Sequence, residues 1–451
     1  MLEFDVAVLG GGPAGANAAL ATASAGLRVA LFDENPRPDP RADTRVLGAN
    51  NVTTFFSHPV WSVTTGYRID AAGPDGPQSV ARALIVACGT TDRMVPFEGW
   101  TTPGVIGLAA ASMQLKSPLK LPGESLIAGR GPLIAAIAAK AIKAGCRIAA
   151  IADLAGTADW ARNLPAMAAR PDLLLQGLGW WRTIRRAGTL QYARHSLVRV
   201  EPHGKRLRAT LAPCDAAGRM IDAKPSFVLA DRIVVSHGLC PATEITRLLR
   251  ARHRYSSDAG GWIVAADEYG RTSRALLYVA GDAAGTAGAA AAEIHGTLVG
   301  LACASDLCGA DASHMRRRIE LLRRKHRRAA RFGRAMGKLM ALRPAHVEGI
   351  RPETIVCRCE GVTRSEIDAA CDTGAGDMNQ LKAWTRCGMG ECQGRICGDI
   401  AGDLLMLRTG AASREEIGYF TARTPLRPVT VEALTGNFLY EQIAIPNAAP
   451  L

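Results

Sequence analysis

The stretch "DVAVLGGGPAGANAALATASAGLRVALFDEN", residues 5–35, decides the fold of this chain. An apolar run is followed by a glycine-rich turn, an alanine-rich segment of helical length and a second apolar run. This order predicts a β-strand, a helix and a second parallel strand, which is the unit of doubly wound α/β proteins. The turn carries the pattern G-x-G-x-x-G at Gly10, Gly12 and Gly15.

The residue types in this turn fit the binding of a dinucleotide. Gly10 allows the tight turn, Gly12 lets the backbone approach a pyrophosphate, and Gly15 lets the helix pack closely on the strand. Pro13 and Ala14 begin the helix, whose positive N-terminus then faces the phosphates. We therefore predict a dinucleotide site that includes all five residues.

Two acidic residues end the second strand of this unit. A carboxylate at this place accepts hydrogen bonds from the ribose of a dinucleotide. Asp33 fits the ribose position best, and Glu34 is the alternative.

A second unit of the same kind begins at "SLIAGRGPLIAAIAAKAIKAGCRIAAIAD", residues 125–153. It has Gly129 and Gly131, but Ile134 stands where the third glycine would be. Two interpretations remain open: a nicotinamide dinucleotide site, or a domain of this type kept only as scaffold. The missing small residue favours the scaffold.

Two further segments resemble parts of the glutathione-reductase-like flavoproteins. In "YVAGDAAG" a buried strand runs into Gly281 and Asp282, and in "ALIVACGTTD" a strand ends near Gly89. In that class the Gly-Asp pair lies beside the flavin, and the second segment returns the chain from the first domain. The resemblance covers about residues 1–305. It implies an FAD domain, split by an inserted NAD-like domain, with Gly89, Gly281 and Asp282 in the FAD site.

Disulfide reduction is not expected of this chain. Relatives that reduce disulfides carry a close cysteine pair within the flavin or inserted domain. Six cysteines precede the C-terminal region, and we interpret them as core or incidental: Cys88, Cys146, Cys214, Cys240, Cys303 and Cys308. His295, on an alanine-rich helix, is interpreted as structural, and we predict no catalytic residue in this chain.

The chain has 451 residues, twelve cysteines and a net charge of +13. No signal peptide or membrane-spanning segment is predicted, so a cytoplasmic location is expected, or a peripheral one on the inner face of the membrane. In a reducing compartment, twelve cysteines indicate metal ligands or core residues rather than disulfides.

The C-terminal cysteines follow the pattern C-x-C-x32-C-x4-C. A [2Fe–2S] cluster needs four thiolates, and paired short spacings from two loops supply them. A tetrahedral zinc site is the rival for the same residues. The context "VCRCEGVT" and "TRCGMGECQGRICG" resembles the bacterioferritin-associated-ferredoxin-like (BFD-like) [2Fe–2S] domain. That resemblance implies Cys357, Cys359, Cys392 and Cys397 as ligands, with Cys387 as a neighbour, although Cys387 and Cys392 have the same x4 spacing.

Most of the net positive charge lies between the two regions. Residues 311–343 hold twelve Lys and Arg against two acidic residues, on an amphipathic helical pattern. The preferred interpretation is a linker helix that packs its apolar side on its own protein. A partner-subunit interface and an anionic membrane surface are the alternatives, and nucleic acid is not expected because no aromatic residues are interleaved with the charges.

The whole arrangement resembles the large α subunit of hetero-oligomeric, flavin-dependent amino-acid and opine dehydrogenases. This family includes octopine and nopaline oxidases, multi-subunit proline and hydroxyproline dehydrogenases and hydrogen cyanide synthase. The resemblance implies that a β subunit, itself a flavoprotein, oxidises the substrate C–N bond, while this chain moves electrons. It also implies FAD, or an adenine nucleotide in its place, a [2Fe–2S] cluster, and FMN at the interface as a further option. A small ferredoxin-like subunit is a further partner, and a dye, quinone or carrier takes the electrons.

The predicted organisation has five parts. They are an FAD domain over 1–115 and 241–310, an inserted NAD-like domain over 116–240, a basic linker over 311–350, and a [2Fe–2S] domain with a tail over 351–451. The alternative functions are a self-contained NAD(P)H-dependent flavin oxidoreductase of the ferredoxin-reductase kind, and a non-catalytic scaffold that holds zinc.

Overall fold

The computed structural model describes residues 1–73, 76–117, 120–309 and 313–435. Its first sheet has the strand order β3-β2-β1-β6-β5-β4, and β19 pairs with β6. β1, β2, β3, β6 and β19 are parallel, as the glycine-rich unit predicts. The strands are β1 (Leu2–Leu9), β2 (Val29–Phe32), β3 (Val52–Phe55), β4 (Val60–Val63), β5 (Arg68–Ala71), β6 (Gln78–Val86) and β19 (Leu277–Val279).

Two helices pack closely on this sheet, α1 (Pro13–Ala23) and α7 (Ala289–Cys308). Glycines of α7 make the contact possible. A Cβ atom at Gly296 would lie 2.0 Å from the carbonyl oxygen of Ala14, and one at Gly300 would lie 2.5 Å from that of Ala18. Close approach of the two backbones therefore explains the Gly/Ala-rich sequence of both helices.

A second sheet has the order β11-β10-β9-β15-β8, and all its pairings are parallel. An antiparallel sheet, β12-β13-β14, lies beside it. The strands are β8 (Val105–Gly107), β9 (Glu124–Gly129), β10 (Arg147–Asp153), β11 (Leu190–Ala193), β12 (His195–His203), β13 (Arg206–Pro213), β14 (Ser226–Ala230) and β15 (Arg232–Ser236). Its helices are α2 (Leu108–Gln114), α3 (Pro132–Lys143), α4 (Thr157–Met167) and α5 (Pro171–Arg186).

The chain crosses between the two sheets twice. The crossings are β7 (Thr90–Asp92) and β16 (Leu239–Pro241), which pair antiparallel with each other. Because β8 pairs with β15, the second sheet already begins before residue 108. Division of the chain by its sheets therefore puts the first crossing near Asp92, earlier than the boundary at 115 expected from sequence.

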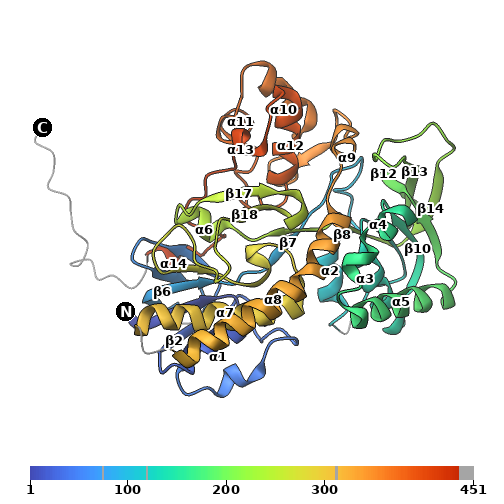
Figure 1. Cartoon of the computed structure of the whole chain (residues 1–451). Coiled ribbons are helices and arrows are strands. Elements are labelled where there is room, and N and C mark those ends of the chain that lie inside the picture. The colour runs from blue at the N-terminus through green and yellow to red at the C-terminus, as the bar shows by residue number, and fades with distance from the viewer. Residues whose placement is uncertain (74–75, 118–119, 310–312, 436–451) are drawn as a thin grey trace, which may run out of the picture.

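The C-terminal domain is small and mostly helical, and it stands on the crossing region (Figure 1). Its elements are α9 (Pro344–Glu348), β20 (Ile355–Cys357), β21 (Val362–Thr363), α10 (Arg364–Asp372), α11 (Met378–Thr385), α12 (Gly398–Thr409) and α13 (Arg414–Ile417). Thr363 and Glu366 form the capping box that begins α10, as their spacing predicts. A buried cluster that includes Leu381 and Leu404 is its core.

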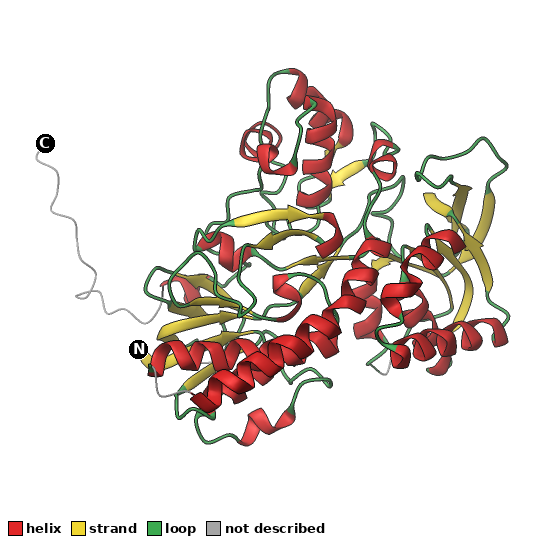
Figure 2. Cartoon of the chain, viewed as in Figure 1, coloured by secondary structure: helices red, strands yellow, loops and turns green. Residues whose placement is uncertain are grey.

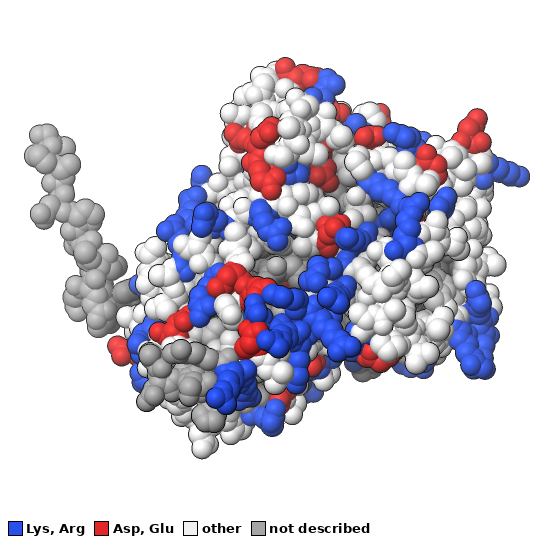
Figure 3. Space-filling model, viewed as in Figure 1, with Lys and Arg blue, Asp and Glu red and all other residues white. Residues whose placement is uncertain are grey.

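The long helix α8 (Ser313–Met340) links the flavin-type sheet to the C-terminal domain. Its apolar residues are buried along two stretches, around Ile319 and around Met336. Its outer face carries a band of Lys and Arg (Figure 3). The apolar side of the helix thus packs on its own protein, as preferred from the sequence.

The remaining elements complete the flavin domain and the end of the chain. They are η1 (Thr44–Gly48), α6 (Glu244–Leu248), β17 (His253–Ser256), η2 (Ser257–Ala259), β18 (Gly261–Val264), η3 (Gly281–Ala284) and α14 (Val431–Thr435). The tail predicted beyond the [2Fe–2S] domain lies in part, at 436–451, outside the described residues. Over the described part of the chain, no helix is long and apolar enough to cross a membrane.

Candidate functional site

A cavity of about 820 Å³ opens at the carboxyl ends of β1 and β2. In doubly wound proteins this edge of the sheet is where ligands bind. Eight of the ten residues predicted for the cofactor line the cavity: Gly10, Gly12, Pro13, Ala14, Asp33, Glu34, Gly89 and Asp282. Asp282 comes from a segment about 250 residues away in the chain, so the fold brings the separate motifs to one place.

The glycine turn is shaped to leave room for a phosphate. Gly12 is the N-cap of α1, and no side chain caps the helix. A Cβ atom at Gly12 would meet no atom within 4 Å, since this position faces the cavity. The first backbone N–H groups of α1 are therefore open to an anionic ligand.

The two predicted residues outside the lining lie directly behind it. A Cβ atom at Gly15 would lie 1.7 Å from the carbonyl oxygen of Gly10, so only glycine lets α1 pack here. Gly281 has φ +66° and lies against Ala14. Its N–H donates to Nδ1 of His295 at 3.0 Å, so His295 holds this turn, as its structural interpretation expects.

The two acidic positions differ in their partners. The Asp33 carboxylate accepts the N–H of Gly11 and, at 2.7 Å, the N–H of Asn35. Its neighbour Glu34 forms an ion pair with Arg427. Asp33 is thus hydrogen-bonded to the glycine turn, at the place where a ribose would bind.

Asp282 lines the same cavity. It accepts the N–H groups of Ala287 and Gly288 at 2.8 and 3.0 Å. Burial raises the pKa of Asp282, and these hydrogen bonds act against that rise. The cavity, the open helix N-terminus and the acid at the ribose position together fit FAD.

Sequence reasoning missed the cations that line this cavity. They are Arg37, Arg41, Lys116 and Arg427. None belongs to a recognisable motif, and Arg427 comes from the far end of the chain. Only the fold could place them beside the glycine turn.

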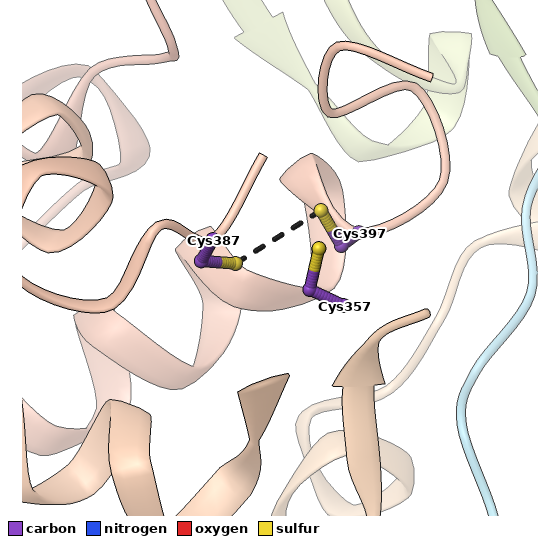
Figure 4. A group of neighbouring side chains, drawn as sticks. All are labelled: Cys357, Cys387 and Cys397. Atoms are coloured by element: carbon purple, nitrogen blue, oxygen red, sulfur yellow. Dashed lines mark hydrogen bonds between the residues drawn. The ribbon is translucent and has the colours of Figure 1, made fainter. Parts of the chain in front are cut away.

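A second site lies in the C-terminal domain, where three buried thiols meet (Figure 4). The sulfur atoms of Cys357, Cys387 and Cys397 all lie within 4.8 Å of one another. The Cys387 thiol donates to Cys397 Sγ at 3.9 Å. Hydrogen bonds from these two thiols lower the pKa of Cys357, and the N–H groups of Gly388 and Glu360 also donate to it.

The other two cysteines form an adjacent, more open pair. Cys359 is exposed and Cys392 is half-buried. Burial raises the pKa of the Cys359 thiol and the neighbouring Cys392 thiol adds to the rise, while the N–H of Cys392 acts against it. A Cβ atom at Gly390 would lie 2.3 Å from Cys359 Cβ, so glycine lets the Cys392 loop close over Cys359.

Five thiols therefore gather where a [2Fe–2S] cluster needs four. The predicted set brings together Cys357 and Cys397 on the buried side and Cys359 and Cys392 on the open side. Cys387 lies as close to Cys357 and Cys397 as a ligand would, so it is more than a distant neighbour. Cys397 is also the N-cap of α12, whose positive end stabilises a negatively charged cluster.

The cysteine loops are fixed to the flavin domain by two ion pairs. Arg93, near the first crossing, pairs with Asp399 in the first turn of α12 at 2.8 Å, and both side chains are buried or nearly so. Arg395, between Cys392 and Cys397, pairs with Glu244 at 3.0 Å. The next residue after Glu244, Ile245, lines the large cavity.

The second glycine turn is covered by the end of α8. A Cβ atom at Gly131 would lie 2.8 Å from Met340 Cγ. Arg130 is buried, and its Nε donates to the carbonyl oxygen of Leu339 at 2.7 Å. The last residues of α8 therefore lie directly on the second glycine turn.

Comparisons with known proteins match both regions of the chain. Residues 4–302 match the pyridine nucleotide-disulphide oxidoreductase family, and residues 355–406 match the BFD-like [2Fe–2S] binding domain. The chain belongs to the pyridine nucleotide-disulphide oxidoreductase family, with a BFD-like domain at its C-terminal end. Membership makes it a flavin oxidoreductase with FAD and [2Fe–2S] as its cofactors.

Two relatives of this chain are subunits of larger enzymes. The A subunit of opine oxidase from Agrobacterium tumefaciens (strain Ach5) is 30% identical over 96% of this chain and 91% of the relative. The HcnB subunit of hydrogen cyanide synthase from Pseudomonas aeruginosa is 30% identical over 94% of this chain and 97% of the relative. The family resemblance predicted from sequence is confirmed.

Solved structures share the fold. L-proline dehydrogenase from P. horikoshii has a TM-score of 0.66 at 19% identity, over 96% of this chain and 79% of that one. Thioredoxin reductase of T. acidophilum has a TM-score of 0.50 at 17% identity, over 68% of this chain and all of the other. The predicted fold class, a two-dinucleotide-domain flavoprotein with a small helical [2Fe–2S] domain, is confirmed.

Proposed function

We propose that this chain is the electron-transferring subunit of a hetero-oligomeric dehydrogenase that oxidises the C–N bond of an amino acid or opine. The substrate site lies in a partner flavoprotein subunit. Proline, hydroxyproline, octopine or nopaline, and glycine are the substrate classes. The names of the relatives, the A subunit of opine oxidase and the HcnB subunit of hydrogen cyanide synthase, support both the chemistry and the need for a partner.

One contact carries the proposal. Arg395 lies between two of the proposed cluster ligands and pairs with Glu244, whose neighbour Ile245 lines the cofactor cavity. The loop that holds the cluster is thus in direct contact with the wall of the FAD site. This is the arrangement that electron transfer between the two cofactors needs.

The two cofactors together convert electron number, because a flavin accepts an electron pair and releases electrons singly to a one-electron [2Fe–2S] centre. The chain holds the flavin at the glycine turn and Asp33. It holds the cluster, in our proposal, with Cys357, Cys359, Cys392 and Cys397. Arg93 and Asp399 keep the two sites in a fixed relation.

The alternative, a self-contained NAD(P)H oxidoreductase, would need a nucleotide at Gly129–Pro132. Met340 and Leu339 of α8 lie on that turn. The covered turn therefore favours the subunit function. We also place the complex in the cytoplasm, with a dye, quinone or small carrier as acceptor, since none of the twelve cysteines, all of them among the described residues, forms a disulfide.

The decisive experiment compares the chain alone with the chain purified together with its partner. Under anaerobic conditions, we expect L-proline, D-octopine and glycine to leave the flavin spectrum of the isolated chain unchanged. One of them should reduce the flavin of the complex. Oxidation of an amino acid by the isolated chain at a useful rate would contradict the proposal, and a colourless, zinc-containing protein would contradict it as well.

The cluster ligands are tested by single serine variants and EPR after dithionite. We expect Cys392→Ser and Cys397→Ser to lose the [2Fe–2S] signal, and Cys387→Ser to keep it. Cys371→Ser, in α10 and away from the five thiols, is the matched control. Loss of the signal in Cys387→Ser with retention in Cys392→Ser would replace the proposed set.

A further inference from the structure

The chain beyond α13 leaves the cluster domain and returns to the flavin domain, where α14 is the last described helix (Figure 1). We call residues 419–430 the C-terminal strap. Its upper part is anchored beside the cysteines. Phe420 fills the space next to Gly388 and Gly394, where a Cβ atom would lie 2.5 and 2.6 Å from its ring. The N–H of Thr421 donates to Asn379 Oδ1 at 3.0 Å.

The middle of the strap is fixed from both domains at one residue. Leu426 is buried in the core of the flavin domain, and its N–H donates to the carbonyl oxygen of Trp61 at 2.8 Å. Its carbonyl oxygen accepts Nη2 of Arg395, also at 2.8 Å. The position of the next residue, Arg427, is therefore set by the flavin core and by the cluster loop together.

Arg427 lies in the wall of the FAD cavity. It lines the cavity with Gly12 and Asp33, and its guanidinium pairs with Glu34 at the carboxyl end of β2. Both side chains of the pair are partly exposed, 38% for Arg427 and 49% for Glu34. A pair as open as this contributes little to stability, so stability alone does not explain why Arg427 is held here.

The chemistry of this place identifies the ligand. Asp33 and Glu34 stand at the ribose end of a dinucleotide site, and two adjacent carboxylates repel a phosphate-bearing ligand. A guanidinium beside them neutralises one charge, donates hydrogen bonds to ribose or phosphate oxygen, and stacks on a purine ring. No other described Lys or Arg forms an ion pair with Glu34.

We propose that Arg427 is a binding residue for the adenosine half of FAD, brought into the cavity by the C-terminal strap. Arg395 is its positioning residue, because it holds Leu426 from the cluster loop. The FAD site is thus completed by a segment that follows the cluster domain, far outside the motifs that define the site.

The test measures cofactor binding by the full-length, deflavinated protein. FAD is titrated by fluorescence quenching, and ADP and FMN are used as separate competitors. We expect Arg427→Ala to raise the Kd for FAD and for ADP about tenfold or more, while the weaker binding of FMN changes less than twofold. Arg395→Gln should give a smaller loss of FAD affinity, since it loosens the strap without removing the guanidinium.

The matched control is Arg423→Ala, which removes an exposed arginine of the same strap and should leave all three Kd values within twofold. Circular dichroism and the [2Fe–2S] EPR signal report whether each variant folds. If Arg427→Ala does not fold, Arg427→Lys keeps the charge and should still weaken FAD and ADP several-fold.

An Arg427 variant that folds and binds FAD and ADP within twofold of the wild type would overturn the proposal. A variant that weakens FMN as much as ADP would also overturn it, because the effect would not be on the adenosine half. These measurements use no substrate and no partner subunit. A failure here is therefore distinct from a failure of the proposed electron transfer.

Discussion

The two glycine turns of this chain each precede a helix, but only the first of them is open to a cavity. Gly12 and Gly131 hold the same position in their units, each at the N-cap of the following helix. A Cβ atom at Gly12 would point into open space, whereas one at Gly131 would lie 2.8 Å from Met340 Cγ. One turn is open to a cavity of about 820 Å³, and the other is covered by α8.

The difference teaches that the motif alone does not make a phosphate site. The N-terminus of α3 carries a partial positive charge, as any helix start does. Here the carbonyl end of α8 lies against it, and Arg130 satisfies the carbonyl oxygen of Leu339, one of the last four of its helix. The carbonyl end of α8 thus stands where the negative charge of a ligand would face the N-terminus of α3.

The largest expected effect comes from truncating Met340, the α8 side chain that covers the second glycine turn. Met340 is buried against Leu339 and Ala155, so Met340→Ala should lower the free energy of unfolding by about 2–4 kcal/mol. Flavin content should not change, since the open turn is elsewhere. Chemical denaturation followed by circular dichroism measures the loss. The exposed Met113→Ala should stay within about 0.5 kcal/mol, and an equally small loss for Met340→Ala would show that the cover is loosely packed.

The acid that ends the second strand of the covered unit should make stability depend on pH. Burial raises the pKa of Asp153 to about 6, while the N–H groups of Ala155 and Gly131 donate to it. A carboxyl with a raised pKa in the folded state favours folding when protonated, so its contribution is lost as pH rises from about 4 to 6. Between pH 4 and pH 7, we expect the free energy of unfolding of Asp153→Asn to rise by about 2 kcal/mol relative to that of the wild type. Parallel stability curves for the two proteins would contradict this.

The open turn should respond to substitution in ligand binding rather than in stability. Gly12 has φ −72°, which alanine adopts without strain. Gly12→Ala places a methyl group where the pyrophosphate binds, so the Kd for FAD should rise about tenfold, about 1.4 kcal/mol. The matched variant Gly131→Ala should keep FAD binding within twofold and lower the melting temperature. If Gly131→Ala weakened FAD binding and Gly12→Ala did not, the second turn rather than the first would bind the pyrophosphate.

The smallest effect is expected from added nicotinamide nucleotides, which should not reduce the flavin. NADH and NADPH should leave the flavin absorbance of the anaerobic protein unchanged, because the end of α8 lies on the turn that would bind them. Dithionite should bleach the same sample, which shows that the flavin can be reduced. Rapid bleaching by either nucleotide would mean that α8 moves aside, and it would restore the alternative function.

The open turn could be proposed from sequence patterns because its determinants are local. Gly10, Gly12 and Asp33 lie within one strand–helix–strand unit, where spacing alone fixes geometry. Gly281 and Asp282 followed from family resemblance, and the fold places them against the same helix. Eight of the ten predicted positions line one cavity.

The parts that could not be predicted depend on distant contacts. Arg130 and Leu339 are 209 residues apart, and nothing in either segment marks the other as a partner. The strand β8 has three residues, too few to show a period of two, so the sequence does not mark it as part of the second sheet. Spacing alone could not decide between Cys387 and Cys397, because only the fold shows that both thiols lie beside Cys357.

The contact between Glu34 and Arg427 spans 393 residues, which bears on how the protein is made. At about 5–20 residues per second, the ribosome needs roughly 20–80 s after adding Glu34 to add Arg427. The flavin domain can fold during that time, but its cavity still lacks one wall. Tight retention of FAD is then a late event in biogenesis. A chain cut short before residue 427 would fold much of its structure, keep its four cluster cysteines and lose its FAD on a desalting column.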